Sequence, residues 1–300
     1  MGTGSYTPSS YTKYAKSKGH TVKKDGSLAG DLTTEQLYTS TSLSKALNPY
    51  KVMRECCDFD EHPNTRPVIL GLDVTGSMGN VATNIAKQLN PLMTQLFAVV
   101  PDIEFMTIAI GDLKTDDVPI QISQFESDIR IVDQLHQIYF EGHGGGNGFE
   151  SYTAAWYMAL RHTKMDCLKR GYKPLIITMG DEALNPYLPA GKLKAVTGDN
   201  IEGDIDTKKL YAEASKLFEI HHIGVGASFD YYQSDIERTW GKLLGEKYHE
   251  ATEETITDVI LNIVLDYYNQ TKYDYTPATD PEVSEGVYIN PETGGLRWQN

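Results

Sequence analysis

The sequence lacks the features of a membrane-spanning or disulfide-stabilised protein. No apolar run approaches the roughly 18 residues that a bilayer span requires. The first twenty residues have no apolar core, so we expect no secretory signal. Only three cysteines occur, Cys56, Cys57 and Cys167, and they form no Cys-x-x-Cys pair. An odd count does not suit a disulfide framework, and we therefore expect a protein of the reducing cytoplasm.

Positive charge is also scarce. The chain has 27 basic and 41 acidic residues and a net charge of −14. Nucleic acids and anionic membranes attract basic surfaces, so neither is expected to be the main partner. The acidic balance is compatible with cation binding, with basic protein partners, or simply with solubility.

The length and composition suit one large domain with extensions. Of the 300 residues, 40% are hydrophobic, which is enough for a sizeable core. Residues 1–66 are expected to form a partly mobile N-terminal extension in which Thr33–Gln36 is a capping box that opens a short helix. Residues 67–270 are expected to form the main domain. Residues 271–300 form a polar tail in which a hairpin is possible around 290–295.

Short apolar segments alternate with segments of helical periodicity in the main domain. The segment 79–100 has apolar residues at helical spacing, and Pro91 is predicted to kink or split this helix. Pro119 indicates that the strand at 118–125 lies at an edge. We predict an α/β fold with a doubly wound, mostly parallel central sheet of about six strands. Expected strands are 68–72, 103–110, 118–125, 174–178, 219–225 and 247–250; expected helices are 79–100, 127–139, 151–163, 207–218, 234–244 and 254–268; residues 185–206 are expected to be a loop insertion.

Three loops at strand ends contain unusual side chains. In an open α/β sheet, ligands bind at the carboxyl ends of the strands. The loops are 73–79 (DVTGSMG), 142–150 (GHGGGNGFE) and 180–182 (GDE). In the first, Asp73 supplies a carboxylate and Thr75 and Ser77 supply hydroxyls, and Gly76 and Gly79 are expected to allow unusual φ angles. These hard oxygen ligands favour Mg²⁺ or Mn²⁺.

Two other interpretations of the first loop fit less well. A nucleophile elbow requires G-x-S-x-G, but Thr75 occupies the position of the first glycine. A glycine-rich oxyanion loop would precede the nucleophile, whereas here it follows Ser77 by roughly 65 residues. No phosphate-binding G-x-x-x-x-G-K-[ST] motif occurs. A serine hydrolase and a phosphate loop are therefore both disfavoured.

The string Asp-Val-Thr-Gly-Ser-Met-Gly after an apolar strand resembles the metal-ion-dependent adhesion site (MIDAS) of von Willebrand factor A (VWA) domains, whose pattern is D-x-[ST]-x-S. The resemblance covers about residues 67–270 and is of the intracellular, bacterial or phage-like type. It implies a metal site formed by Asp73, Thr75, Ser77, Asn147 and Asp181.

The sequence departs from the family pattern in the second and third loops. The family's second loop usually has a threonine, where this chain offers Asn147, with Thr153 as a fallback and Glu150 as a supporting neighbour. The family's third loop usually contains T-D-G, whereas TMGDE places the acid two positions later, at Asp181.

The resemblance implies a binding module rather than an enzyme. A bound Mg²⁺ (or Mn²⁺ or Ca²⁺) would accept an Asp or Glu from a protein partner, and the chain would act as an adaptor or assembly subunit. An AAA+ ATPase of the MoxR kind is one candidate partner; no nucleic acid or membrane is expected. Two alternatives remain, a metal-dependent hydrolase that uses the same ion and a structural subunit with a vestigial site.

Two adjacent histidines, His221 and His222, lie on a predicted strand, so one should point inward and the other outward. They have no Cys or acidic partners at zinc spacing, and we expect a structural role.

Overall fold

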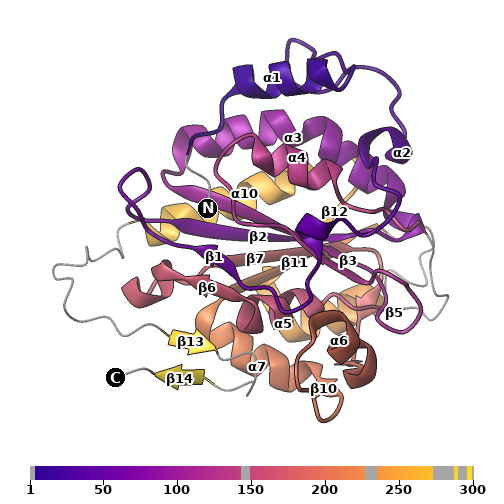
Figure 1. The fold of residues 1–300 in the computed structure, drawn as a ribbon, viewed down its shortest axis with the longest axis vertical. Helices are drawn as coiled ribbons and strands as arrows, with labels where there is room; N and C mark the ends of the chain where they lie inside the picture. The colour runs from indigo at the N-terminus through magenta and orange to yellow at the C-terminus, as the bar shows by residue number, and fades with distance from the viewer. Residues whose placement is uncertain (1–3, 143–148, 227–234, 273–286, 290–295, 299–300) are drawn as a thin grey trace.

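The computed structural model describes residues 4–142, 149–226, 235–272, 287–289 and 296–298. Its centre is a six-stranded sheet in the order β12-β11-β7-β2-β3-β4 (Figure 1). Neighbouring strands are parallel except β4, which is antiparallel to β3. The α/β class and the expected edge position of the third strand are therefore confirmed. The strands are β2 (Arg66–Asp73), β3 (Ile103–Ile110), β4 (Ile120–Ile122), β7 (Leu175–Gly180), β11 (Glu219–Val225) and β12 (Tyr248–Ala251).

Helices cover both faces of this sheet (Figure 1). Side chains alternate along β2, so Leu70 and Leu72 join one core cluster and Ile69 joins the other. Every residue of β2 is buried, as expected for a strand covered on both sides. One face carries α1 (Pro8–Ser17), α3 (Gly79–Val99), α4 (Arg130–His136) and α10 (Ile256–Thr271); the other carries α5 (Ala154–Arg161), α6 (Ala190–Thr197) and α7 (Thr207–Leu217).

The direction in which strands are added reverses between β2 and β7. From β2 the chain continues to β3 and β4 on one side, and from β7 it continues to β11 and β12 on the other. The carboxyl ends of β2 and β7 therefore adjoin the point where the two series diverge. Such a point is where open α/β sheets bind ligands.

Smaller elements complete the chain. The loop expected at 185–206 is wrong in part, because it contains α6, whose Leu193 is fully buried against the sheet-covering helices. The antiparallel pairing of β13 with β14 confirms the hairpin in the tail, and its turn lies outside the described residues. The remaining elements are α2 (Thr34–Leu37), η1 (Lys45–Leu47), β1 (Arg54–Cys56), η2 (Gly76–Met78), β5 (Phe149–Glu150), β6 (Thr163–Met165), η3 (Asp166–Arg170), β8 (Ala183–Leu184), β9 (Tyr187–Leu188), β10 (Ile205–Asp206), η4 (Glu237–Gly241), α9 (Lys242–Leu244), η5 (Gly245–Lys247), β13 (Val287–Ile289) and β14 (Leu296–Trp298).

Pro91 lies inside α3, which is one continuous helix, so of the predicted kink or split the split is wrong. A proline has no N–H, so the carbonyl of Lys87, four residues earlier, has no helical donor. The backbone N–H of Leu28 donates to that carbonyl at 3.0 Å. The N-terminal extension thus satisfies the group that the proline leaves open.

The N-terminal extension packs closely against α3. Tyr6 and Tyr11 are buried in the same core cluster as the apolar face of this helix. The Tyr6 hydroxyl donates to Asn90 Oδ1 at 2.9 Å, and Asn90 Nδ2 donates to the Gly26 carbonyl at 2.8 Å. The capping box at Thr33 and Gln36 is confirmed. The domain boundary at residue 66 stays a prediction.

The two strand histidines lie as expected. His222 is fully buried and stacks on Trp240 with ring centroids 3.6 Å apart, whereas His221 is partly exposed. None of the helices in the described part of the chain combines the length and the hydrophobicity that a bilayer span requires.

Candidate functional site

Asp73, at the end of β2, is held by the turn that follows it. Its side chain is fully buried. Oδ1 accepts hydrogen bonds from the Thr75 backbone N–H at 2.8 Å and from the Thr75 hydroxyl at 2.5 Å. This local turn is the kind that aspartate favours at strand ends. It places the 3₁₀ turn η2, which contains Ser77, directly before α3.

The second loop begins against the first. Gly142 N–H donates to the Val74 carbonyl at 3.5 Å, and a Cβ on Gly76 would lie 2.7 Å from the Gly142 carbonyl oxygen. Gly76 is therefore required for this close approach. The expectation of unusual φ angles is wrong, because Gly79 has φ −55° and Gly76 is not among the glycines with positive φ. Asn147 lies outside the described residues.

Asp181, just past the end of β7, reaches the first loop. Ser77 lies close enough to the Asp181 carboxylate to oppose the rise in its pKa that burial causes. The Oδ1 atom of Asp181 is buried and has no hydrogen-bond partner among the described residues. The structure thus brings together Asp73, Thr75, Ser77 and Asp181, although Asp181 is displaced by two positions from the family pattern.

Tyr152 is the site residue that the sequence analysis missed. Its fully buried hydroxyl donates to Asp73 Oδ2 at 2.7 Å and accepts from the Glu182 N–H at 3.3 Å. A Cβ on Gly180 would lie 2.2 Å from this hydroxyl, so only glycine fits at the end of β7. No spacing rule pointed to Tyr152. The fallback residue Thr153 accepts a hydrogen bond from Asn185 Nδ2 at 2.7 Å and is fully buried.

Buried carboxylates accumulate around this turn. Burial, and secondarily Asp181, raise the pKa of Asp73 to about 7, although hydrogen bonds from Thr75 and Tyr152 oppose the rise. Burial followed by the charge of Asp73 raises the pKa of Glu150 to about 10, and Glu150 Oε2 has no hydrogen-bond partner. Burial also raises the pKa of Asp181. These shifts reflect desolvated acids with too little positive charge nearby.

The donor set contains few of the side chains that usually identify a metal site. Among residues 4–142, 149–226 and 235–272, no three His, Cys, Asp or Glu side chains group closely enough to hold an ion. The predicted set includes only two such groups, Asp73 and Asp181. Its other members are hydroxyls and the amide of Asn147.

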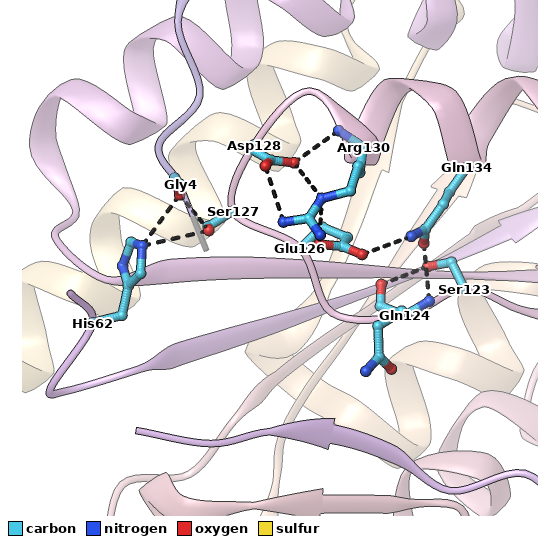
Figure 2. Close-up of polar contacts among 9 residues, drawn as sticks. All are labelled: Gly4, His62, Ser123, Gln124, Glu126, Ser127, Asp128, Arg130 and Gln134. Carbon is cyan, nitrogen blue, oxygen red and sulfur yellow. Dashed lines mark hydrogen bonds and ion pairs between the residues drawn. The ribbon is translucent and has the colours of Figure 1, made fainter. Parts of the chain in front are cut away.

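A serine, a histidine and an aspartate also meet elsewhere in the molecule. Ser127 Oγ lies 3.5 Å from His62 Nε2, and His62 Nδ1 lies 3.4 Å from Asp102 Oδ1. Figure 2 shows, however, that the Ser127 hydroxyl donates to the Gly4 carbonyl, at 2.6 Å, and the same carbonyl lies 3.2 Å from His62 Nε2. Ser127 is fully buried. This group therefore anchors the N-terminal segment rather than presenting an activated nucleophile.

No protein-family model matches the sequence, and no curated protein matches it. Among solved structures, the pilus adhesin SpaC from Lactobacillus rhamnosus GG is similar in fold, with a TM-score of 0.50 and 13% sequence identity over 69% of this chain and 31% of SpaC. The open conformation of SpaC gives a TM-score of 0.48 at 12% identity, over 69% of this chain and 30% of SpaC. Proximal thread matrix protein 1 from the mussel byssus gives 0.45 at 12% identity, over 68% of this chain and 46% of that protein. The chain thus spans about a third of SpaC, and at this identity the likeness concerns the fold alone.

Proposed function

We propose that this chain is a VWA-like, doubly wound module that binds a protein partner through Mg²⁺ and serves as an adaptor or assembly subunit rather than an enzyme. One observation carries the proposal: Asp73, at the carboxyl end of β2, and Asp181, just past the end of the adjacent strand β7, lie close enough for the charge of Asp181 to raise the pKa of Asp73. This is the place in the sheet where the strand order reverses.

Two features of the described residues support the proposal of a hard cation. Asp181 Oδ1 and Glu150 Oε2 are buried acceptors without donors, and the pKa values of the surrounding carboxyls are raised. A positive ion would relieve both conditions. The Thr75 and Ser77 hydroxyls and the Asp73 and Asp181 carboxylates would hold Mg²⁺, and Asn147 completes the proposed set. Mn²⁺ or Ca²⁺ would use the same oxygens.

The partner would present an Asp or Glu. A hard cation held by few charged ligands keeps open positions and can accept a further carboxylate. Both this chain and such a partner segment are acidic, so the ion is what would make their contact favourable. An AAA+ ATPase of the MoxR kind in the cytoplasm is the candidate partner, and no nucleic acid or membrane is involved.

Thermal denaturation tests the metal site. Millimolar Mg²⁺ should raise the melting temperature of the wild-type protein relative to EDTA, because an ion that binds only the folded chain adds about 2.7 kcal/mol at a hundred times its Kd. Asp73→Ala should abolish the shift. Asp60→Ala, which removes an exposed acid outside the site, should retain it. Equal melting temperatures with and without Mg²⁺ in the wild type would support the vestigial alternative instead.

Partner capture tests the binding role. Wild type and Asp73→Ala would be compared as baits, each with Mg²⁺ and with chelator. Retention only by wild type with Mg²⁺ is expected, and equal retention in all four arms would show that the partner does not use the site. Mg²⁺-dependent turnover of a phosphate or ester substrate that is lost in Asp73→Ala would favour the hydrolase alternative.

A further inference from the structure

A cavity lies at the end of β2 opposite the acidic site. Arg66 begins β2 and Asp73 ends it, so the two are about 23 Å apart along the strand. The cavity has a volume of about 220 Å³. Its lining includes Asn64, Arg66, Arg170, Tyr172, Lys173 and Tyr267. It therefore combines three cationic side chains with two aromatic ones in a chain whose net charge is −14.

Arg66 is a buried cation for which only some of the favourable interactions of its guanidinium are present. It is 8% exposed, and its Cζ lies 5.0 Å from the ring centroids of both Tyr172 and Tyr268. These contacts engage the flat surface of the guanidinium. Nη1, at its edge, is buried without a hydrogen-bond partner. A buried charged donor without an acceptor is costly, so this edge favours an incoming anion.

The other two cations differ in how they are neutralised. Arg170 forms an ion pair with Asp58 and donates to the Thr65 carbonyl at 2.8 Å. Lys173 donates to the Ser215 carbonyl at 2.8 Å, a contact that supplies no negative charge. Among the described residues, neither Arg66 nor Lys173 is paired with a carboxylate. Within the part of the chain that the structure describes, two positive charges at the cavity thus have no carboxylate partner.

Asn64 adds a neutral polar group to the same cavity. Its Oδ1 is buried without a partner. The orientation of a side-chain amide is assigned from its hydrogen bonds, so a half-turn would offer Nδ2 as a donor instead. Asn64 can therefore serve either a phosphate oxygen or a hydroxyl of the ligand.

We propose that this cavity binds a dianionic phosphate group, either free or as the monoester of a small molecule. Two uncompensated cations match a dianion better than a monoanion, and the planar edge of Arg66 suits phosphate oxygens. The volume is below the 300–1,000 Å³ that is typical for drug-sized ligands, so the organic part of a bound ester is small. This site is independent of the metal proposed at Asp73.

Thermal denaturation with defined anions tests the proposal. The full chain would be melted in EDTA, at constant ionic strength, with increasing inorganic phosphate, glycerol phosphate or acetate. Phosphate or its ester should raise the melting temperature in a saturable way, and acetate should act far more weakly. Arg66→Gln should weaken the apparent affinity for phosphate by roughly tenfold or more, since it removes a charge-assisted hydrogen bond. Arg238→Gln, the same charge change at an exposed arginine, should leave the affinity unchanged.

A second measurement covers the case in which Arg66→Gln fails to fold. Backbone amide shifts of the wild-type chain, titrated with phosphate, should change at Gly171, Lys173 and Thr271, which line the cavity. Lys173→Gln should weaken those changes. Shifts confined to other regions, a melting response that never saturates, an Arg66→Gln affinity equal to wild type, or acetate as effective as phosphate would each overturn the proposal.

Discussion

The two ends of β2 handle buried charge in different ways. At the first end, Arg66 lies over two tyrosine rings, which stabilise the face of its delocalised charge but leave Nη1 at its edge without a hydrogen-bond partner. At the second end, the buried carboxyls of Asp73 and Glu150 lie near the half-buried Asp181, and aromatic faces cannot stabilise an anion in the same manner. Raised pKa values and unpartnered oxygens result. The acidic end should therefore depend on pH and cations, whereas the arginine end should respond to anions.

The largest effect on stability is expected from adding a methyl group at Gly180, where the end of β7 packs against Tyr152. In Gly180→Ala, the new methyl would lie 2.2 Å from the Tyr152 hydroxyl, so the ring must move away from Asp73. Overpacking and the lost hydrogen bond should together lower the free energy of unfolding by about 2–4 kcal/mol. Urea denaturation at equilibrium measures the change.

Gly191→Ala is the matched control. Its Cβ would meet nothing within 4 Å, and it lies inside α6. Alanine is the better helix former there, so stability should rise by about 0.5–1 kcal/mol. A Gly180→Ala variant that is at least as stable as wild type, as the control should be, would show that Tyr152 is not tightly packed against β7.

A smaller effect is expected from pH at the acidic end. The pKa of Glu150 is about 10 in the folded chain against 4.5 in its reference state, and that of Asp73 is about 7 against 3.8. The folded state therefore holds more protons than the unfolded state. The stabilisation that Glu150 and Asp73 provide is complete below about pH 4 and is lost as the pH rises through their folded pKa values. In EDTA, Glu150→Gln should gain stability relative to wild type as pH rises from about 5 to 9.

Urea denaturation at several pH values checks this prediction. Added Mg²⁺ should reduce the loss in wild type, because a cation stabilises the charged carboxylates. Parallel profiles for wild type and Glu150→Gln would mean that Glu150 is not held protonated by its surroundings.

The smallest stability change is expected at Ser77, which is exposed. Ser77→Ala removes an exposed hydroxyl that lowers the pKa of Asp181, and the free energy of unfolding should fall by about 1 kcal/mol or less. The Mg²⁺-induced melting shift should nevertheless disappear, and Ser77→Thr, which keeps the hydroxyl, should preserve it. The phosphate response at the Arg66 cavity should be unchanged, which would separate the two ends of β2. A full Mg²⁺ shift in Ser77→Ala would remove Ser77 from the proposed ligands.

The sequence predicted correctly those elements whose structure depends on residues close to one another along the chain. The strands at 103–110 and 219–225 begin and end as expected, because short β-rich apolar runs are bounded by turn residues. The Asp73–Ser77 turn is equally local, since Asp73 binds Thr75 two residues later. By contrast, α6 lies in a segment rich in Gly, Asp and Pro, and the burial of Leu193 in the core cluster on its face of the sheet is what secures it.

The sequence by itself determined the α/β alternation, the edge position of the proline-containing strand and the oxygen-rich turn after β2, because each depends on periodicity or on contacts between near neighbours. Only the tertiary structure decided that Leu28 satisfies the carbonyl left open by Pro91, that Tyr152 holds Asp73, and that Asp181 meets Ser77. It also placed Arg66 over Tyr172 and Tyr268, which lie more than a hundred residues away in the chain. Such contacts join distant segments through burial and hydrogen bonding, and no periodicity along the chain encodes them.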